Sequence, residues 1–535
     1  GTISDFDGKF SLENITPGIY KIRCSYISYE TIFAEGVEVK PGEVTKLSFQ
    51  LGEAALGLEE VVVTAKAVRR TEAAIQTIKK KSANLMDGIS SQQISRMGDS
   101  DAAGALQRVT GVSVVGGKYV YVRGLGDRYM KTLLNGADIP GLDPNKNTVQ
   151  MDIFPSNLIE NMMVNKTFTA DLPGNFTGGL VNIQTKDFPE EFTFQFNTSI
   201  GFNPQSSFNN DFLSYDGKGK TDWLAIEDGS RDLPIDPANV PTITSETRPQ
   251  LTQLTKKFNE KFTPTKRQSF MDHGHSISVG NQVDFLGKKL GFIAGLSYSH
   301  SYKYYDDGLT GEYKRTSLST PILNTEKKYD DHRGVEEVLW GAIGNLTLKL
   351  SNNHKIAWNT MYNRSGDQTG RYMEGIKPSD ASDLLIQTRT VHYIERSLIF
   401  NQLRGEHVFP ADFKFNWSAN YSSSKQNEPD LIFFTNSYYE FNNTYEIEPD
   451  IYKVPARYYR ELSQDNLDLN FDIVKKIDFL GGKSKFKMGG RYLYYDRSFA
   501  EHRINFETNI PYFDDLEGNV DQYVSDQYIG GENPY

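Results

Sequence analysis

The feature that most constrains this chain is a run of alternating apolar and polar side chains over residues 192–202. Successive side chains of a β-strand point to opposite faces, so such a strand has one apolar and one polar face. An ordinary strand has about 5–6 residues, whereas a tilted strand that crosses a bilayer needs about 9–11. The run therefore predicts a membrane-crossing strand. Its apolar positions are Phe192, Phe194, Phe196, Ile200 and Phe202; its polar positions are Thr193, Gln195, Asn197, Ser199 and Gly201, and Thr198 breaks the pattern.

The second part of the chain repeats this pattern. Further strands are predicted over 276–285, 290–302, 338–350, 355–363, 386–408, 413–424, 466–477 and 485–495. Short turns between them alternate with long polar loops, expected at 203–274, 303–337, 364–385 and 425–465. Short turns at one end and long loops at the other are typical of outer-membrane barrels. We therefore expect residues 188–535 to form the N-terminal part of an antiparallel transmembrane β-barrel; a soluble carbohydrate-binding β-sandwich is the alternative.

Composition fits this interpretation and excludes other classes. The 535 residues contain no run of about 18 apolar residues, which excludes a transmembrane helix. A mean hydropathy of -0.52 is compatible with a barrel, because only alternate residues face lipid. The net charge of -11 argues against a nucleic-acid partner, since phosphate binding needs a basic face.

Residues 1–52 predict a small β-sandwich. Asp7-Gly8, Pro17-Gly18 and Pro41-Gly42 are turn signals between short alternating stretches. Cys24, the single cysteine, is expected to be buried in this sandwich. Asp5 and Asp7 are interpreted as a solvated turn rather than a Ca²⁺ site. The chain begins inside an expected strand and ends without a closing element, so we expect truncation at both ends.

A β-branched stretch lies in the linker predicted at 53–83. Its three valines and a threonine favour an extended conformation, yet no partner strand follows at hairpin distance. It could be the last strand of the preceding sandwich, or an unpaired edge available to another chain. The stretch comprises Glu60, Val61, Val62, Val63, Thr64 and Ala65. The basic residues 68–81 after it are compatible with a helix or coil.

Residues 84–187 predict a compact α+β module. Ser100 is a plausible N-cap of a helix that Gly111 ends, and Ser156 is the expected cap of a second, short helix. An Asn-Gly turn and a Gly-Gly pair mark the strand ends that follow.

This module resembles the plug domain of TonB-dependent outer-membrane receptors. The resemblance rests on several short motifs in the family's order, including Val122-Arg123-Gly124, Leu134-Asn135-Gly136, 155–160 and Pro173-Gly174 to Gly178-Gly179. The N-terminal residues likewise resemble a carboxypeptidase regulatory-like domain through Asp5, Asp7, Gly8, Phe10, Pro17, Gly18 and Tyr20. The expected fold class is thus mainly β: a small β-sandwich, an α+β plug domain, and a partial antiparallel transmembrane β-barrel.

The resemblance implies an energy-coupled importer. Residues 60–65 look like a TonB box, which would pair with TonB and transmit traction from its inner-membrane complex to the plug. The barrel would lie in outer-membrane lipid, with the N-terminal domain and plug on the periplasmic side. The implied cargo is a scarce nutrient such as a siderophore-like chelate, cobalamin or an oligosaccharide. The alternative is a barrel that acts as a non-transporting binding, structural or assembly component.

Candidate site residues beyond the box are few. The plug motif comprises Arg123, Gly124, Asn135, Gly136, Gly178 and Gly179. Arg123 and Arg128 are the candidate substrate contacts, and a structural ion pair explains Arg123 equally well. No catalytic motif or cofactor site is found. His273 and His275 could share a strand face, but without a third ligand they are interpreted as polar loop-edge residues rather than a metal site.

Overall fold

The computed structural model describes residues 10–12, 15–24, 32–42, 44–49, 71–99, 101–141, 143, 146, 148–186, 188–189, 191–315, 322–378, 384–411, 413–441, 443–447, 455–479, 482–506, 512–514, 520–525 and 529. The predicted box at 60–65, the acids Asp5 and Asp7, and Ser100 lie outside these residues. The chain divides into two compact units, Gly1–Thr64 and Ala65–Tyr535.

The first unit contains an antiparallel pair of strands, β1 (Gly18–Cys24) and β2 (Ile32–Val39). A register shift between Tyr20 and Ile22 interrupts their ladder. Cys24 is half-buried rather than fully buried as predicted, because it ends β1 instead of sitting in its centre.

The second unit begins with the predicted α+β module. Its five-stranded sheet has the order β3-β8-β9-β6-β7, in which β6 and β9 run parallel. These strands are β3 (Met86–Ser90), β6 (Met130–Leu134), β7 (Ala137–Asp138), β8 (Ile159–Asn165) and β9 (Gly179–Thr185). A separate hairpin is formed by β4 (Val112–Val115) and β5 (Tyr119–Val122). Three helices accompany them: α1 (Glu72–Lys81), α2 (Ser91–Met97) and α3 (Ala102–Leu106).

The helix termini correct two sequence predictions. The carboxylate of Asp101, not Ser100, caps α3 by accepting from the Gly104 N–H at 2.9 Å. This helix already ends at Leu106, and Gly111 instead uses its positive φ to lead into β4. Ser156 caps no helix: it starts the 3₁₀ turn η3 (Ser156–Leu158), and its hydroxyl donates to the Asp99 carbonyl at 2.5 Å.

The helices of the described residues are short. None of them is long and apolar enough to cross a membrane. Besides the plug helices, they include α4 (Arg248–Thr255), α5 (Val520–Tyr523) and the 3₁₀ turns η1 (Asp127–Tyr129), η2 (Met151–Ile153), η4 (Asp222–Leu224) and η5 (Pro237–Asn239).

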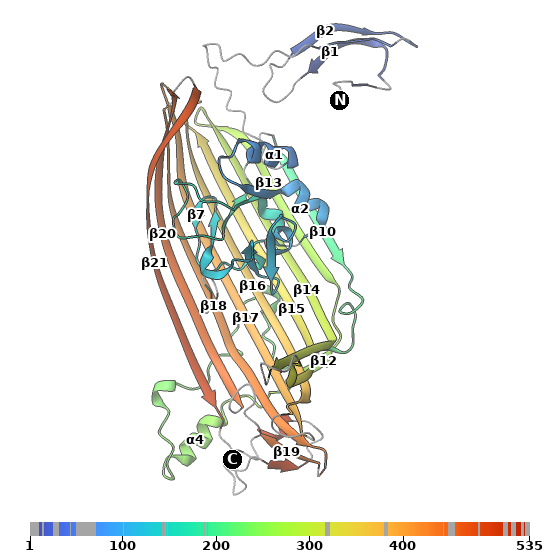
Figure 1. Cartoon of the computed structure of the whole chain (residues 1–535), viewed down its shortest axis with the longest axis vertical. Helices are drawn as coiled ribbons and strands as arrows, with labels where there is room; N and C mark the ends of the chain where they lie inside the picture. The colour runs from blue at the N-terminus through green and yellow to red at the C-terminus, as the bar shows by residue number, and fades with distance from the viewer. Residues whose placement is uncertain are drawn as a thin grey trace. The chain divides into compact units, whose positions relative to one another are not determined.

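Long antiparallel strands form a curved sheet beside the plug (Figure 1). Within the residues that the structure describes, nine strands follow one another in it, as the sequence predicted. The strands β19 (Thr444–Ile447) and β22 (Tyr512–Asp514) extend it beside the end of β18. The nine are β10 (Thr193–Gly201), β13 (Asp272–Phe285), β14 (Lys288–Lys314), β15 (Asn324–Lys349), β16 (His354–Ile376), β17 (Leu384–Phe409), β18 (Phe413–Tyr439), β20 (Ala456–Phe479) and β21 (Gly482–Asn505).

Three of the four predicted long loops are wrong. Most of 303–337, 364–385 and 425–465 continues the strands, so β14 and β18 reach 27 residues each. The prediction failed because alternation fades where the two faces of the sheet do not differ: residues 365–369 of β16 are polar on both faces, and Leu431–Phe434 of β18 are apolar on both. The backbone ladder continues there because it does not depend on the side chains. The remaining long connection, residues 203–271, carries β11 (Phe212–Ser214), β12 (Thr265–Arg267), α4, η4 and η5.

The two faces of the sheet have different neighbours. On the inner face, Ile343, Met361, Leu398 and Phe400 are buried in one core with the plug. On the outer face, alternate residues are exposed and apolar: Leu346, Trp358, Ile399 and Leu403. The predicted apolar outer face is therefore confirmed on these strands, while the inner face is also apolar where it touches the plug.

Residues 203–271, here called the outer segment, pack against the outer face of β15 and β16. Three glycines of this face make room for the segment's backbone. A Cβ on Gly334 would lie 2.1 Å from the Leu213 carbonyl oxygen, one on Gly370 2.7 Å from the Ser214 oxygen, and one on Gly366 2.8 Å from the Ala225 Cβ. The glycines of these strands therefore permit the close packing of the outer segment.

Replacing Gly366 by Val should detach the outer segment locally. The added side chain overlaps Ala225, and overpacking of this kind costs about 1–3 kcal/mol. We expect faster trypsin cleavage within residues 203–271 of the folded protein. The matched control is Gly344→Val, on the outer face of β15, where an added Cβ meets only the Thr360 methyl at 3.2 Å. Equal cleavage of the two variants would contradict this packing.

Candidate functional site

The candidate site lies where the plug touches the inner face of the sheet. The β4–β5 hairpin turns at Gly116 and Gly117, which both have positive φ, and so presents Lys118 at its tip. The Lys118 ammonium is paired with Asp152 of the plug at 3.3 Å and with Asp367 on β16. One lysine therefore ties the plug tip to the wall.

From Asp367 a chain of polar contacts crosses the inner face of four further strands. Arg396 on β17 donates to Asp367 at 2.9 Å and to Gln426 on β18 at 3.2 Å. Gln426 donates to Glu428 at 2.9 Å. Arg460 on β20 then bridges Glu428 at 3.3 Å and Glu501 on β21 at 2.7 Å. We call the path from Lys118 to Glu501 the inner polar chain.

A second group of contacts joins the plug to β20 and β21. The backbone N–H of Asp138 donates to the Asp468 carboxylate at 2.8 Å. Arg491 holds the same carboxylate through two nitrogens at 2.9 and 2.5 Å. Arg497 donates to the Asp143 carbonyl at 2.5 Å. Paired polar groups thus line the boundary between the plug and the sheet. Such pairs hold the plug in place, and water can replace each partner when the interface opens.

The plug motif residues stabilise the plug itself. Asn135 and Gly136 form a left-handed turn, and the Asn135 side chain exchanges hydrogen bonds of 3.0 Å with the Thr185 backbone N–H and hydroxyl. A Cβ on Gly178 would lie 2.8 Å from the Leu125 Cβ, and one on Gly179 2.9 Å from Val122. The structure places Gly124 in the turn after β5, with positive φ.

The candidate substrate contacts lie apart from the inner polar chain. The Arg123 guanidinium donates to the Lys166 carbonyl and to the Gly178 carbonyl at 3.3 Å. It therefore crosslinks plug backbone segments, and the partners are carbonyls rather than the carboxylate of the predicted ion pair. Arg128 is exposed in η1. A role of either arginine in substrate binding stays a hypothesis.

Sequence reasoning missed the inner polar chain. Lys118 and Asp367 are 249 residues apart, and no local pattern connects them. The available signal was the charged residues inside a predicted strand: Arg396 and Glu395 occur amid the apolar alternation of β17.

A third histidine, His300, lies near His273 and His275 in the structure. The His300 ring lies 5.3 Å from His273, which lies 5.9 Å from His275. Within the described part of the chain, however, no three His, Cys, Asp or Glu side chains are placed to hold a metal ion. The Nε2 atom of His300 instead contacts Glu336 at 2.9 Å.

The geometry defines a class of protein in which a small α+β domain rests against the inner face of a curved sheet of long strands. Residues 78–180 match the family model of the TonB-dependent Receptor Plug Domain, and residues 1–63 match that of the CarboxypepD_reg-like domain. The chain therefore contains a plug domain of the kind found in TonB-dependent receptors, preceded by a carboxypeptidase regulatory-like domain. The TonB-dependent receptors to which it is similar are not enzymes.

Solved structures of low identity were also found. The ferric preacinetobactin receptor BauA of Acinetobacter baumannii is 14% identical with a TM-score of 0.39, over 79% of this chain and 60% of that one. The ferric-catecholate import receptor Fiu of E. coli K12 is 12% identical with a TM-score of 0.37, and the match covers 78% of this chain and 67% of that one. The pyoverdine receptor FpvA of Pseudomonas aeruginosa PAO1 is 10% identical with a TM-score of 0.37, and the match covers 80% of this chain and 59% of that one. The chain thus spans 60% of the length of BauA. No curated protein matches it.

Substituting Lys118 by Met should loosen the plug tip. The change removes the ammonium that Asp152 and Asp367 share. Leaving these carboxylates without this partner should destabilise the contact between plug and sheet by about 1–3 kcal/mol. Hydrogen exchange of the amides in residues 112–122 should then become about tenfold faster or more. Lys266→Met is the control, because it breaks an exposed pair with Asp211 and should leave this exchange unchanged. Unaltered hydrogen exchange in the Lys118 variant would contradict the conclusion that Lys118 holds the plug tip to the sheet.

Proposed function

We propose that this protein is an energy-coupled importer of the outer membrane, with the N-terminal domain and plug facing the periplasm. The observation that carries the proposal is a plug domain tied to the inner face of the sheet by the inner polar chain. Such a plug can close a pore at rest, since its ion pairs hold it in place. It can also be moved, because these polar groups can be hydrated once the contacts open.

Domain boundaries follow the same proposal. We infer a regulatory-like domain at 1–52, a linker with the TonB box at 53–83, the plug at 84–187 and the barrel portion at 188–535. Helix α1 lies at the end of this linker, where Thr71 caps it by accepting from the Ala74 N–H at 3.2 Å. Outer-membrane lipid is the proposed surrounding of the barrel's outer face.

Traction on residues 60–65 would reach the plug through α1. Lys79 of α1 pairs with Asp87 of β3 at 2.8 Å, and Lys166, just after β8, approaches the same carboxylate at 3.5 Å. Burial tends to raise the pKa of Asp87, but the Lys79 hydrogen bond, the Gly88 N–H and the charge of both lysines outweigh it and lower this pKa. The carboxylate therefore stays charged and joins α1 to β3, the edge strand of the plug sheet. Pulling on α1 would load this edge first.

The proposed cargo is a scarce nutrient such as a siderophore-like chelate, cobalamin or an oligosaccharide. It would meet the plug tips and the inner wall beyond them. Basic and acidic side chains alternate along the inner polar chain. This balance of charge favours neither an anionic nor a cationic cargo.

A proline in the box tests energy coupling. Val62→Pro removes one backbone N–H and should prevent strand pairing with TonB, whereas Val62→Thr retains a β-branched side chain and the N–H. We expect Val62→Pro to abolish uptake and TonB binding while cell-surface binding of cargo is retained. Val62→Thr should preserve all three. Uptake by cells carrying Val62→Pro would instead favour the non-transporting binding or structural component.

A further inference from the structure

The outer face of the sheet changes character along its strands. Near the short turns it carries exposed apolar residues in neighbouring positions, such as Leu346, Trp358 and Leu403, which are Cα partners across β15, β16 and β17. Six residues further along β16, about 20 Å along the strand, the outer face carries Arg364, which pairs with Glu395 at 2.9 Å. Charged groups are expensive in hydrocarbon. The row of Trp340, Arg364 and Ser397, which are Cα partners, therefore bounds the apolar band.

The outer segment contacts the sheet at this row. The Trp340 indole donates to the Leu224 carbonyl at 2.8 Å, and the Arg364 Nε donates to the Ala225 carbonyl at 2.5 Å. The Glu227 backbone N–H donates to Glu395 at 2.7 Å. The η4 turn is thus fixed against the last row before the apolar surface begins.

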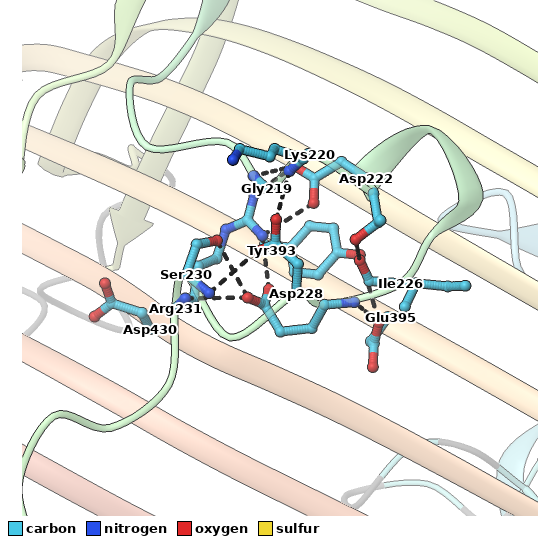
Figure 2. A network of polar contacts seen from close by, with 12 residues as sticks. Gly219, Lys220, Asp222, Ile226, Asp228, Ser230, Arg231, Tyr393, Glu395 and Asp430 are labelled. Carbon is cyan, nitrogen blue, oxygen red and sulfur yellow. Dashed lines mark hydrogen bonds and ion pairs between the residues drawn. The ribbon is translucent and has the colours of Figure 1, made fainter.

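A buried ion cluster keeps this turn in place. Arg231 donates to Asp222 at 3.0 and 2.5 Å and to Glu227 at 2.6 Å, and its guanidinium lies 4.2 Å from the Tyr393 ring centre (Figure 2). Burial opposes the charge of Arg231, but Tyr215 and both carboxylates outweigh it and raise the pKa of the guanidinium. A permanently charged arginine therefore holds Asp222, the first residue of η4, and Glu227, three residues after its end, beside the wall residue Tyr393.

Trp223 projects from this fixed turn into the surroundings. It is 57% exposed, although Asp222 before it is buried and Leu224 after it is half-buried. Ala225, directly after η4, has a φ of 54°, a strained conformation for a residue with a Cβ. A large indole is thus exposed on a turn whose backbone is bonded to the row that bounds the apolar band.

We propose that Trp223 anchors the outer segment in the outer surface of the bilayer, at the boundary between headgroups and acyl chains. Tryptophan favours this boundary because one side of its ring is apolar while its N–H can reach water or headgroups. The two residues that follow Trp223 are bonded to Trp340 and Arg364, and the row Trp340–Arg364–Ser397 marks the edge of the apolar band. This inference rests on the proposed location in the outer membrane.

Depth-dependent fluorescence quenching tests the anchor. The full chain is placed in lipid nanodiscs whose lipids carry a nitroxide either near the headgroup or near the chain end. The emission of Trp223 is obtained as the difference between the parent protein and Trp223→Phe. We expect the headgroup nitroxide to quench this emission more than the chain-end nitroxide does. Emission quenched only by water-soluble iodide, or protected from all three quenchers, would overturn the proposal.

Trp358→Phe separates the failure of the anchor from the failure of the proposed function. Trp358 lies within the apolar band and should lose more emission to the chain-end nitroxide. If neither nitroxide quenches Trp358, the barrel is not in lipid and the proposed location fails. If Trp358 behaves as expected while Trp223 does not, only the anchor is wrong.

Discussion

The structure depends on one constraint, the backbone hydrogen-bond ladder between neighbouring strands of the long sheet. This ladder leaves the side chains free to differ on the two faces, so one face can be apolar and the other can hold charges. The ion pair Arg396–Asp367 exists on the inner face because β16 and β17 are in register over their whole shared length, and it places Asp367 where Lys118 of the plug reaches it. Both the plug contacts and the apolar band therefore follow from the same register.

The inner face combines two kinds of contact with the plug. Apolar residues such as Met361 and Phe400 share a buried core with it, whereas the inner polar chain holds its tip. Apolar burial is non-directional and would tolerate sliding, but ion pairs fix one position. Under the proposed energy-coupled import, this division would let the plug stay in place at rest and still be moved by traction.

Sequence predicted the fold well where the pattern was local. The alternation at 386–408 marks β17 almost to its ends, and the plug motifs lie in the expected order. It failed where the two faces of a strand do not differ, as in the last part of β18, where the consecutive residues Leu431–Phe434 are apolar on both faces, because periodicity then carries no signal. The inner polar chain could not be predicted from local patterns, since Lys118 and Asp367 meet only in the folded chain.

Lipid accessibility of successive residues on β17 tests the account most directly. With Cys24, the single cysteine, replaced by Ala, single cysteines are placed at Ile399, Phe400, Gln402 and Leu403 and exposed to a membrane-dissolved thiol label. The account predicts labelling at Ile399 and Leu403, whose side chains lie on the outer face, and none at Phe400 and Gln402, which face the plug. Labelling without this alternation, or none at all, would contradict a wall with lipid outside and a plug inside.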